Sequence, residues 1–117
     1  MPESTVKKQL NRAKQAACQT LNKAGYKIER ASNDIYCVVA MRDVEWRAIK
    51  IGTEQLQACL WFKKEVKRLE RLPCPDSTKI KKEVWIRSQN ERGFCQYSWN
   101  GLQWINEDGE SALALNN

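Results

Sequence analysis

The segment Ile35–Met41 (IYCVVAM) constrains the fold most strongly, because it is apolar at odd and even positions alike. A strand that is apolar on both faces is typical of the buried centre of a sheet. The turn signal Ser32-Asn33-Asp34 precedes this segment, and Arg42-Asp43 predicts a tight turn into a returning strand over 44–52. Residues 34–52 are therefore predicted to form a β-hairpin.

Two amphipathic helices are predicted around this hairpin. Residues 4–24 carry apolar side chains at steps of three and four, and Gly25 supplies the left-handed residue that ends the helix. Residues 53–72 repeat the pattern, with Thr53 as the N-terminal cap and Pro73 directly after the last turn. The inner stripe expected for this second helix consists of Leu56, Cys59, Leu60, Val66 and Leu69.

A second hairpin is predicted near the C-terminus. Its strands, Phe94–Trp99 and Leu102–Ile105, flank Asn100-Gly101, the dipeptide most typical of a two-residue β-turn. With that turn, Trp99 would lie opposite Leu102, and the aromatic residues would form favourable cross-strand pairs. Most tryptophans are expected in the core, with Trp99 and Trp104 the most exposed.

Short strands over 26–31 and 83–89 complete the predicted order, which is α-β-β-β-α-β-β-β. This order belongs to the α+β class. A chain of 117 residues is long enough for one core, so residues 1–106 are expected to form a single domain. Residues 107–117 are expected to form a flexible acidic tail.

Composition excludes several classes of function. The chain has no histidine, which removes every histidine-based acid–base or metal mechanism. Its five cysteines are odd in number and none forms a Cys-x₂₋₄-Cys pair, so neither a zinc site of ordinary spacing nor a disulfide framework is expected. Without a membrane-length apolar run or a signal-peptide pattern, we expect a cytoplasmic protein with no membrane partner.

Positive charge is concentrated in the two predicted helical regions. The net charge is +6; residues 1–24 hold five bases and one acid, and residues 63–82 hold eight bases and three acids. Such clusters attract phosphate backbones, although they also solvate helix faces. The candidate nucleic-acid-binding residues are Lys7, Lys8, Arg12, Lys14, Lys63, Lys64, Lys67, Arg68, Arg71, Lys79, Lys81 and Lys82.

The predicted order resembles the αβββαβ core of the restriction-endonuclease-like, or PD-(D/E)xK, nucleases, with an added C-terminal β-hairpin. The resemblance runs from Val6 to Arg87 and is to the small Holliday-junction-resolvase branch of that family. It rests on Ala24-Gly25-Tyr26 at the helix end, Asn33-Asp34-Ile35 before the apolar strand, and Arg47-Ala48-Ile49-Lys50-Ile51-Gly52 in the returning strand.

The resemblance implies a site that this chain holds only in part. Asp34 matches the family's metal-binding aspartate, but Lys50 stands where the family has an acid and Gly52 stands where it has a lysine. Glu45-Trp46-Arg47 is an acid-x-base triplet on the same strand. The predicted register, however, puts Glu45 near Ala40, roughly 20 Å along the hairpin from Asp34. The candidate catalytic residues are thus Asp34, Glu45 and Lys50, with Mg²⁺ at Asp34 if catalysis is retained.

Three functions remain open from the sequence. The first is a DNA-binding protein with a nuclease-like fold and a degenerate or lost catalytic site, which contacts duplex or branched DNA through its phosphates. The second is a divergent Mg²⁺-dependent DNA endonuclease that uses Asp34. The third is a non-catalytic interaction module that forms a homodimer through its aromatic C-terminal sheet.

Overall fold

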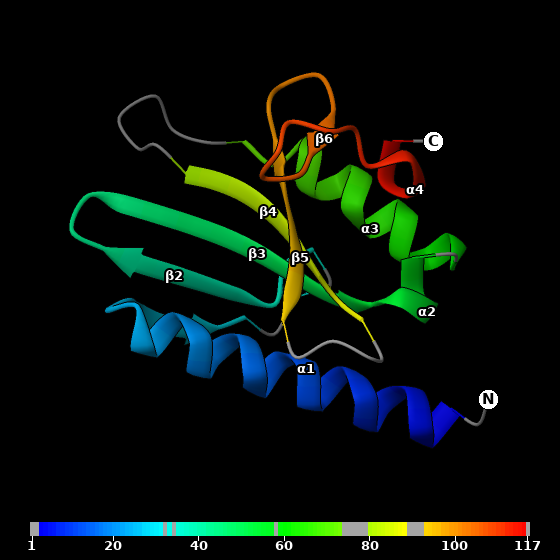
Figure 1. Ribbon diagram of the computed structural model, residues 1–117, viewed down its shortest axis with the longest axis horizontal. Helices are drawn as coiled ribbons and strands as arrows, with labels where there is room; N and C mark the ends of the chain where they lie inside the picture. Colours follow the sequence, from blue (N-terminus) through cyan, green and yellow to red (C-terminus); the bar gives the residue numbers. More distant parts are fainter. Residues whose placement is uncertain are drawn as a thin grey trace.

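The computed structural model describes residues 3–31, 33, 35–57, 59–73, 80–88 and 93–116, apart from the side chains of residues 3, 4, 113 and 114. These residues form a six-stranded mixed sheet flanked by helices (Figure 1). The α+β class predicted from the sequence is confirmed. The elements are α1 (Glu3–Lys23), β1 (Lys27–Arg30), β2 (Val38–Arg42), β3 (Glu45–Thr53), α2 (Glu54–Gln57), α3 (Leu60–Glu70), β4 (Ile80–Arg87), β5 (Phe94–Trp99), β6 (Trp104–Ile105) and α4 (Leu113–Asn116).

The strands lie side by side in chain order, β1 to β6. All neighbouring pairs are antiparallel except β3 and β4, which are parallel. A parallel pair requires a crossover connection, and α2 and α3 lie within it. The two parallel strands therefore have their C-terminal ends at the same edge of the sheet.

Helices cover both faces of the sheet. Ala13 and Leu21 of α1 are buried in one cluster with Ile49 of β3. Phe62 of α3 is buried in a second cluster with Ala48, the preceding β3 residue. Because successive strand side chains point to opposite faces, α1 and α3 lie on opposite sides of β3. The "α1 face" and the "α3 face" below refer to these two sides of the sheet.

α1 is 21 residues long and has the predicted one-sided pattern. Its buried residues Ala13, Ala17 and Leu21 repeat every four positions. Gly25, with φ of 89°, ends the helix as predicted, and the Tyr26 N–H donates back to the Leu21 carbonyl at 3.1 Å. None of the helices in the described part of the chain is long and apolar enough to span a membrane.

The turn of the β2–β3 hairpin differs from the prediction by one residue. Asp43 and Val44 form it, and Asp43 has a positive φ of 54°. Arg42 pairs with Glu45, so Glu45 lies at the hairpin end and not near Ala40 as predicted. An aspartate tolerates the left-handed conformation better than most residues, which explains why the turn forms around Asp43.

β2 is also shorter than the predicted strand, because it begins at Val38. The Asn33 side-chain oxygen accepts hydrogen bonds from the backbone N–H groups of Ile35 and Tyr36, at 2.9 and 3.0 Å. This side-chain turn competes with strand pairing and delays the start of β2.

The predicted second helix is broken into α2 and α3. Thr53 is the last residue of β3 and does not cap the helix, since its hydroxyl has no hydrogen-bond partner among the described residues. Because of this break, the side chains that follow it point in other directions than one continuous helix would give them. Leu60, expected inside, is therefore 68% exposed, and Phe62 takes its place in the core.

The C-terminal hairpin has a longer loop than predicted. Trp99 pairs with Trp104, not with Leu102, which is 88% exposed in the loop. The Asn100 side-chain oxygen accepts hydrogen bonds from the N–H groups of Leu102 and Gln103, each at 2.8 Å, and so closes a four-residue loop. Trp104 is fully buried, which contradicts the expectation that it is exposed.

We expected residues 107–117 to form a flexible acidic tail, and the described part of this segment is in contact with the rest of the domain. Ser111 forms a β-bridge with Ile105, and Ala112 and Leu115 are buried in the same core cluster as Trp104. The three acids at 107, 108 and 110 stay exposed while the following apolar residues pack. The removal of the Ala112 and Leu115 side chains from water stabilises this packing, although the preceding segment is acidic.

Candidate functional site

Lys50 is a buried charged residue near the C-terminal end of β3. Like Ala48 two positions earlier, its side chain points to the α3 face, and Lys50 is only 4% exposed. Its ammonium donates a hydrogen bond to Glu65 of α3, with 2.6 Å between Nζ and Oε2. The same nitrogen lies 5.2 Å from the centre of the Phe62 ring. A buried ammonium is stable only when it is paired, so this contact couples α3 to the centre of the sheet.

A pocket of about 100 Å³ borders the Lys50–Glu65 pair. We call it the Lys50 pocket. Its wall includes Lys14 of α1, Trp61 of α3 and Asn33, which precedes β2. Its volume corresponds to about three water molecules at roughly 30 Å³ each. The pair is therefore accessible to small groups although it lies under a helix.

Basic side chains of α3 flank this pocket. Lys64 lies three positions after Trp61, and Arg68 lies three positions after Glu65, so each base neighbours one of these residues on the helix surface. Trp61 and Glu65 line the pocket. Lys64 and Arg68 are exposed and thus present positive charge on the pocket side of α3.

The N-terminal half of α1 reaches the same place. Its Val6 and Leu10 pack against the core cluster of the α3 face. Lys14 lines the Lys50 pocket, and Lys7 lies seven positions earlier, which is close to two helical turns and hence the same side. We define the pocket rim as Lys7, Lys14, Lys64 and Arg68.

The remaining predicted bases lie away from the rim. Arg12 lines a different pocket, Lys81 forms a 3.6 Å ion pair with Glu45, and Lys82 donates to the Glu70 carbonyl at 2.8 Å. Lys8, Lys63 and Lys67 lie on other sides of their helices, Arg71 follows the end of α3, and Lys79 is outside the described residues.

A second buried ion pair lies on the α1 face. Both Nε and Nη2 of Arg47 donate to the carboxylate of Glu83, and the Trp85 indole N–H donates to the same carboxylate at 3.1 Å. The hydrogen bond to Glu83 raises the pKa of Arg47 far above its ordinary value, against the opposing effect of burial. The Tyr26 ring lies 5.2 Å from the guanidinium carbon. Neither Arg47 nor Glu83 lines the Lys50 pocket or the pocket that Arg12 lines.

The structure does not bring the predicted catalytic residues together. Glu45 and Lys50 are five positions apart on β3, so their side chains point to opposite faces. The Tyr26 hydroxyl donates to Glu45 at 2.9 Å, and this bond, with nearby positive charges, lowers the pKa of Glu45. Asp34 lies outside the described residues. Among the residues that the structure describes, no group of three acidic or cysteine side chains could hold a metal.

Gly52 has a packing role at this site. A Cβ placed on it would lie 2.6 Å from the Cζ atom of Phe62, so only a residue without a side chain fits beneath that ring. The resemblance had placed a lysine at this position. Phe62 occupies the space instead, and it also lines the Lys50 pocket.

Sequence reasoning missed Glu65 as a partner for Lys50. Glu65 lies among the bases of α3, and from the sequence alone it is only one of the acids that lower the net positive charge of residues 63–82. A signal was present, because Glu65 directly precedes Val66 of the predicted inner stripe and therefore borders the buried side of the helix. Glu83 was missed for a similar reason: on its strand it was an acid without a known partner.

Comparisons of this chain with protein-family models, curated proteins and solved structures found no match. The function of the site is therefore inferred from its own residues.

Proposed function

We propose that this protein binds DNA through the pocket rim, so that a backbone phosphate lies over the Lys50 pocket. The observation that carries the proposal is the meeting of Lys14 and Lys50 at one pocket, where Glu65 is the one acid among the described lining residues. Lys64 and Arg68 add exposed positive charge on the same side of α3. Clustered bases of this kind bind phosphates by Coulomb attraction and by release of counterions.

Trp61 favours DNA with unpaired bases within this proposal. It lines the Lys50 pocket and is still 49% exposed. Exposed indoles beside a basic groove stack on unpaired bases whatever their sequence. We therefore expect branched DNA to bind more tightly than a plain duplex, as the expected nuclease-like fold also favours.

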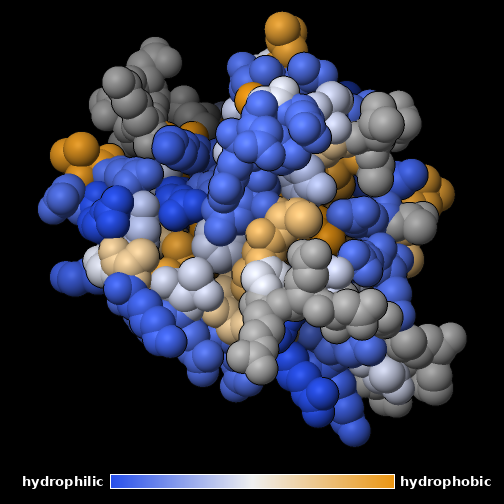
Figure 2. Space-filling view, viewed as in Figure 1, coloured by the Kyte–Doolittle hydropathy of each residue, from blue (hydrophilic) through white to orange (hydrophobic). Residues whose placement is uncertain are grey.

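The exposed apolar residues favour a polar partner over the alternative of an apolar homodimer. They lie in separate places: Val44 and Trp46 at the β2–β3 turn, Leu60 and Trp61 at the start of α3, and Leu102 in the β5–β6 loop. Figure 2 shows one face of the molecule, on which hydrophilic residues dominate and the apolar ones form separated groups. Trp104, expected in a dimer interface, is buried within the chain itself.

Charge reversal on two sides of one helix tests DNA binding. The rim variant is Lys64→Glu/Arg68→Glu, and the matched control is Lys63→Glu/Lys67→Glu, which makes the same charge change on the same helix. Fluorescence anisotropy with a duplex and a four-way junction would be measured between 50 and 200 mM salt. The rim variant should lose at least about tenfold in affinity and about two units of log–log salt slope. Equal losses in both variants, or no binding at the lowest salt, would refute the proposal.

Mg²⁺-dependent DNA cleavage is the second candidate, and the Lys50–Glu65 contact favours it. The carboxylate of Glu65 would supply an oxygen ligand that β3 lacks, together with the Asp34 implied by the family resemblance. Lys50 would stabilise negative charge that develops on the phosphate. If this is right, branched DNA is cut with Mg²⁺ or Mn²⁺, and Asp34→Ala and Glu65→Gln each abolish cutting but keep binding. Absence of cutting with both metals would exclude this candidate.

A further inference from the structure

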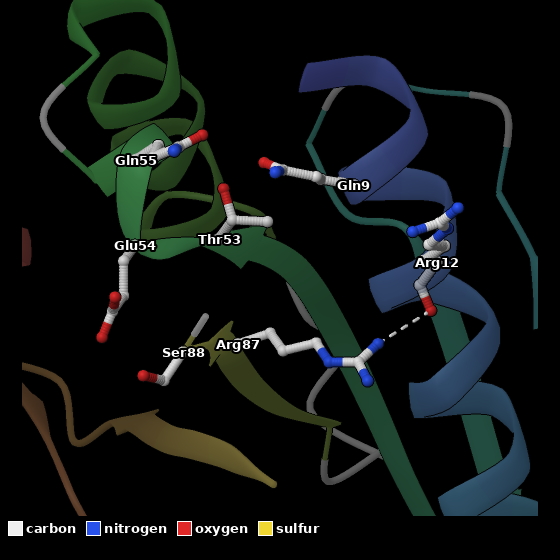
Figure 3. A pocket seen from close by; sticks show the side chains of 7 residues that line it. All are labelled: Gln9, Arg12, Thr53, Glu54, Gln55, Arg87 and Ser88. Carbon is white, nitrogen blue, oxygen red and sulfur yellow. Dashed lines mark hydrogen bonds between the residues drawn. The ribbon is translucent and has the colours of Figure 1, made fainter. Parts of the chain in front are cut away.

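A larger pocket, of about 230 Å³, lies where the parallel strands β3 and β4 end (Figure 3). Thr53 and Arg87, the last residues of the two strands, pair with each other in the sheet and both line it. The space beyond the C-terminal ends of parallel strands is where open α/β sheets bind ligands. The other lining residues are Gln9, Arg12, Glu54, Gln55 and Ser88, none of which lines the Lys50 pocket.

The hydroxyl of Thr53 marks this space as a binding site. Thr53 is only 8% exposed, and its Oγ1 is buried without a hydrogen-bond partner in the part of the chain that the structure describes. In Figure 3 this oxygen lies between the amide groups of Gln9 and Gln55 and points into the pocket. A buried hydroxyl without a partner costs stability, so it calls for a hydrogen-bonding group from outside the chain.

The polar groups around Thr53 can donate hydrogen bonds as well as accept them. The amides of Gln9 and Gln55 and the hydroxyl of Ser88 can each donate. Arg87 reaches across to α1, where its Nη1 donates to the Arg12 carbonyl at 3.2 Å, and this contact fixes the guanidinium at the pocket wall.

Charge in the pocket wall favours an anion. Among the described lining residues, Arg12 and Arg87 provide two positive charges against the single acid Glu54. In Figure 3 the Glu54 carboxylate points away from Thr53 and the two glutamines. This balance of charge, together with the groups that can donate, therefore favours an anionic ligand with several acceptor oxygens.

We propose that this pocket binds a phosphate monoester. The three terminal oxygens of a phosphate accept bonds from several directions, as the separate donors here require, whereas a carboxylate offers two oxygens in one plane. At about 230 Å³ the pocket is smaller than the roughly 300–1,000 Å³ of sites for drug-sized ligands, which fits a sugar phosphate or mononucleotide fragment. The monoester belongs either to a free sugar phosphate or to the 5′ end of a nucleic acid.

This inference does not rest on DNA binding through the pocket rim. The two pockets share no lining residue, so each can be disabled alone. The variant Lys64→Glu/Arg68→Glu should leave phosphate-monoester binding unchanged, which makes failure of one proposal distinguishable from failure of the other.

Calorimetric titration with ribose 5-phosphate, ribose and citrate tests the assignment. Ribose 5-phosphate should bind at least about tenfold more tightly than ribose or citrate. Thr53→Val and Arg87→Gln should each weaken it at least about tenfold, and Lys81→Gln, a change of an exposed base elsewhere on β4, should not. Equal binding of citrate, or no binding of ribose 5-phosphate, would overturn the proposal.

Thr53→Val also separates a ligand-binding role from a structural one. This substitution removes a buried hydroxyl that has no hydrogen-bond partner among the described residues, so it should raise the melting temperature of the free protein by a few degrees. It should also weaken the binding of ribose 5-phosphate. A lower melting temperature with unchanged binding would overturn the proposal. Oligonucleotides with a 5′-phosphate or a 5′-hydroxyl identify the source of the monoester. If the 5′-phosphate oligonucleotide binds more tightly than both the 5′-hydroxyl oligonucleotide and ribose 5-phosphate, the ligand is a nucleic-acid end. If the 5′-phosphate oligonucleotide and ribose 5-phosphate bind with equal affinity, the ligand is a free sugar phosphate.

Discussion

β3 carries two buried ion pairs only three positions apart, on opposite faces of the sheet. On the α1 face, Arg47 uses both oxygens of Glu83, and the Trp85 indole donates to the same carboxylate. On the α3 face, Lys50 contacts one oxygen of Glu65 at 2.6 Å, and a pocket opens beside the pair. In the first pair the Glu83 carboxylate is buried and neither partner lines a pocket, whereas both partners of the second pair line the Lys50 pocket.

This difference distinguishes a buried charge that stabilises the fold from one that can contact a ligand. A planar guanidinium that holds a carboxylate with two hydrogen bonds is rigid and leaves that carboxylate few free lone pairs. An ammonium is a point charge on a flexible chain, and it can exchange one oxygen partner for another. The Arg47 pair is therefore suited to stabilising the fold, and the Lys50 pair is suited to the ligand contact that we propose.

Glu83→Ala should have the largest effect on stability. It leaves the guanidinium of Arg47 buried without its carboxylate, and losses of this kind are about 3–5 kcal/mol. Urea unfolding at pH 7 measures the change. The double variant Arg47→Met/Glu83→Leu should recover most of the loss, because it removes both charges. A loss below about 1 kcal/mol for the single variant would show that the pair is not structural.

Glu65→Ala should cost less, about 1–3 kcal/mol, although the Lys50 side chain is less exposed than the Arg47 side chain. Water in the Lys50 pocket can solvate part of the ammonium charge once the carboxylate is gone. The same unfolding measurement applies, and Glu65→Gln serves as the control that keeps the side-chain volume. A loss as large as that of Glu83→Ala would remove the distinction between the two pairs.

Gly52→Ala should cost about 1–2 kcal/mol and should change the Lys50 pocket. The added Cβ would displace the end of the Phe62 ring, which packs over Gly52 and lines that pocket. We expect lower stability together with a changed fluorescence spectrum of Trp61, measured in a variant that keeps Trp61 as its only tryptophan. Gly93→Ala is the control, since a Cβ there has no atom within 4 Å. Equal stability of the two variants would contradict the close packing at Gly52.

Tyr26→Phe should have the smallest effect, about 0.5–1.5 kcal/mol at pH 7. The Tyr26 hydroxyl lowers the pKa of Glu45 in the folded protein, so its contribution is present above the unfolded pKa and is lost as pH falls through the folded one. The cost of the variant should therefore shrink between pH 7 and pH 3. The phenyl ring remains, so contacts with Arg47 are kept. An unchanged Glu45 pKa in an NMR titration would contradict this account.

Much of the fold follows from local sequence patterns. The three- and four-residue spacing of apolar side chains in α1, its end at Gly25 and the apolar character of Ile35–Met41 predict α1 and β2 within a few residues. The α+β class follows from their order. The predicted turns were wrong where the side-chain oxygens of Asn33 and Asn100 accept hydrogen bonds from backbone N–H groups and so compete with strand pairing. Such bonds depend on a local conformation that hydrophobic periodicity does not describe.

The candidate sites depended on contacts between distant segments. Lys50 and Glu65 are 15 positions apart, and Arg47 and Glu83 are 36 apart, so no local pattern pairs them. By itself, the sequence determined which segments are helices and strands and where the positive charge is concentrated, because side-chain periodicity and charge are local properties. Only the tertiary structure decided which charges are buried together and which pocket each one borders, because those depend on how the crossover places α3 over the sheet.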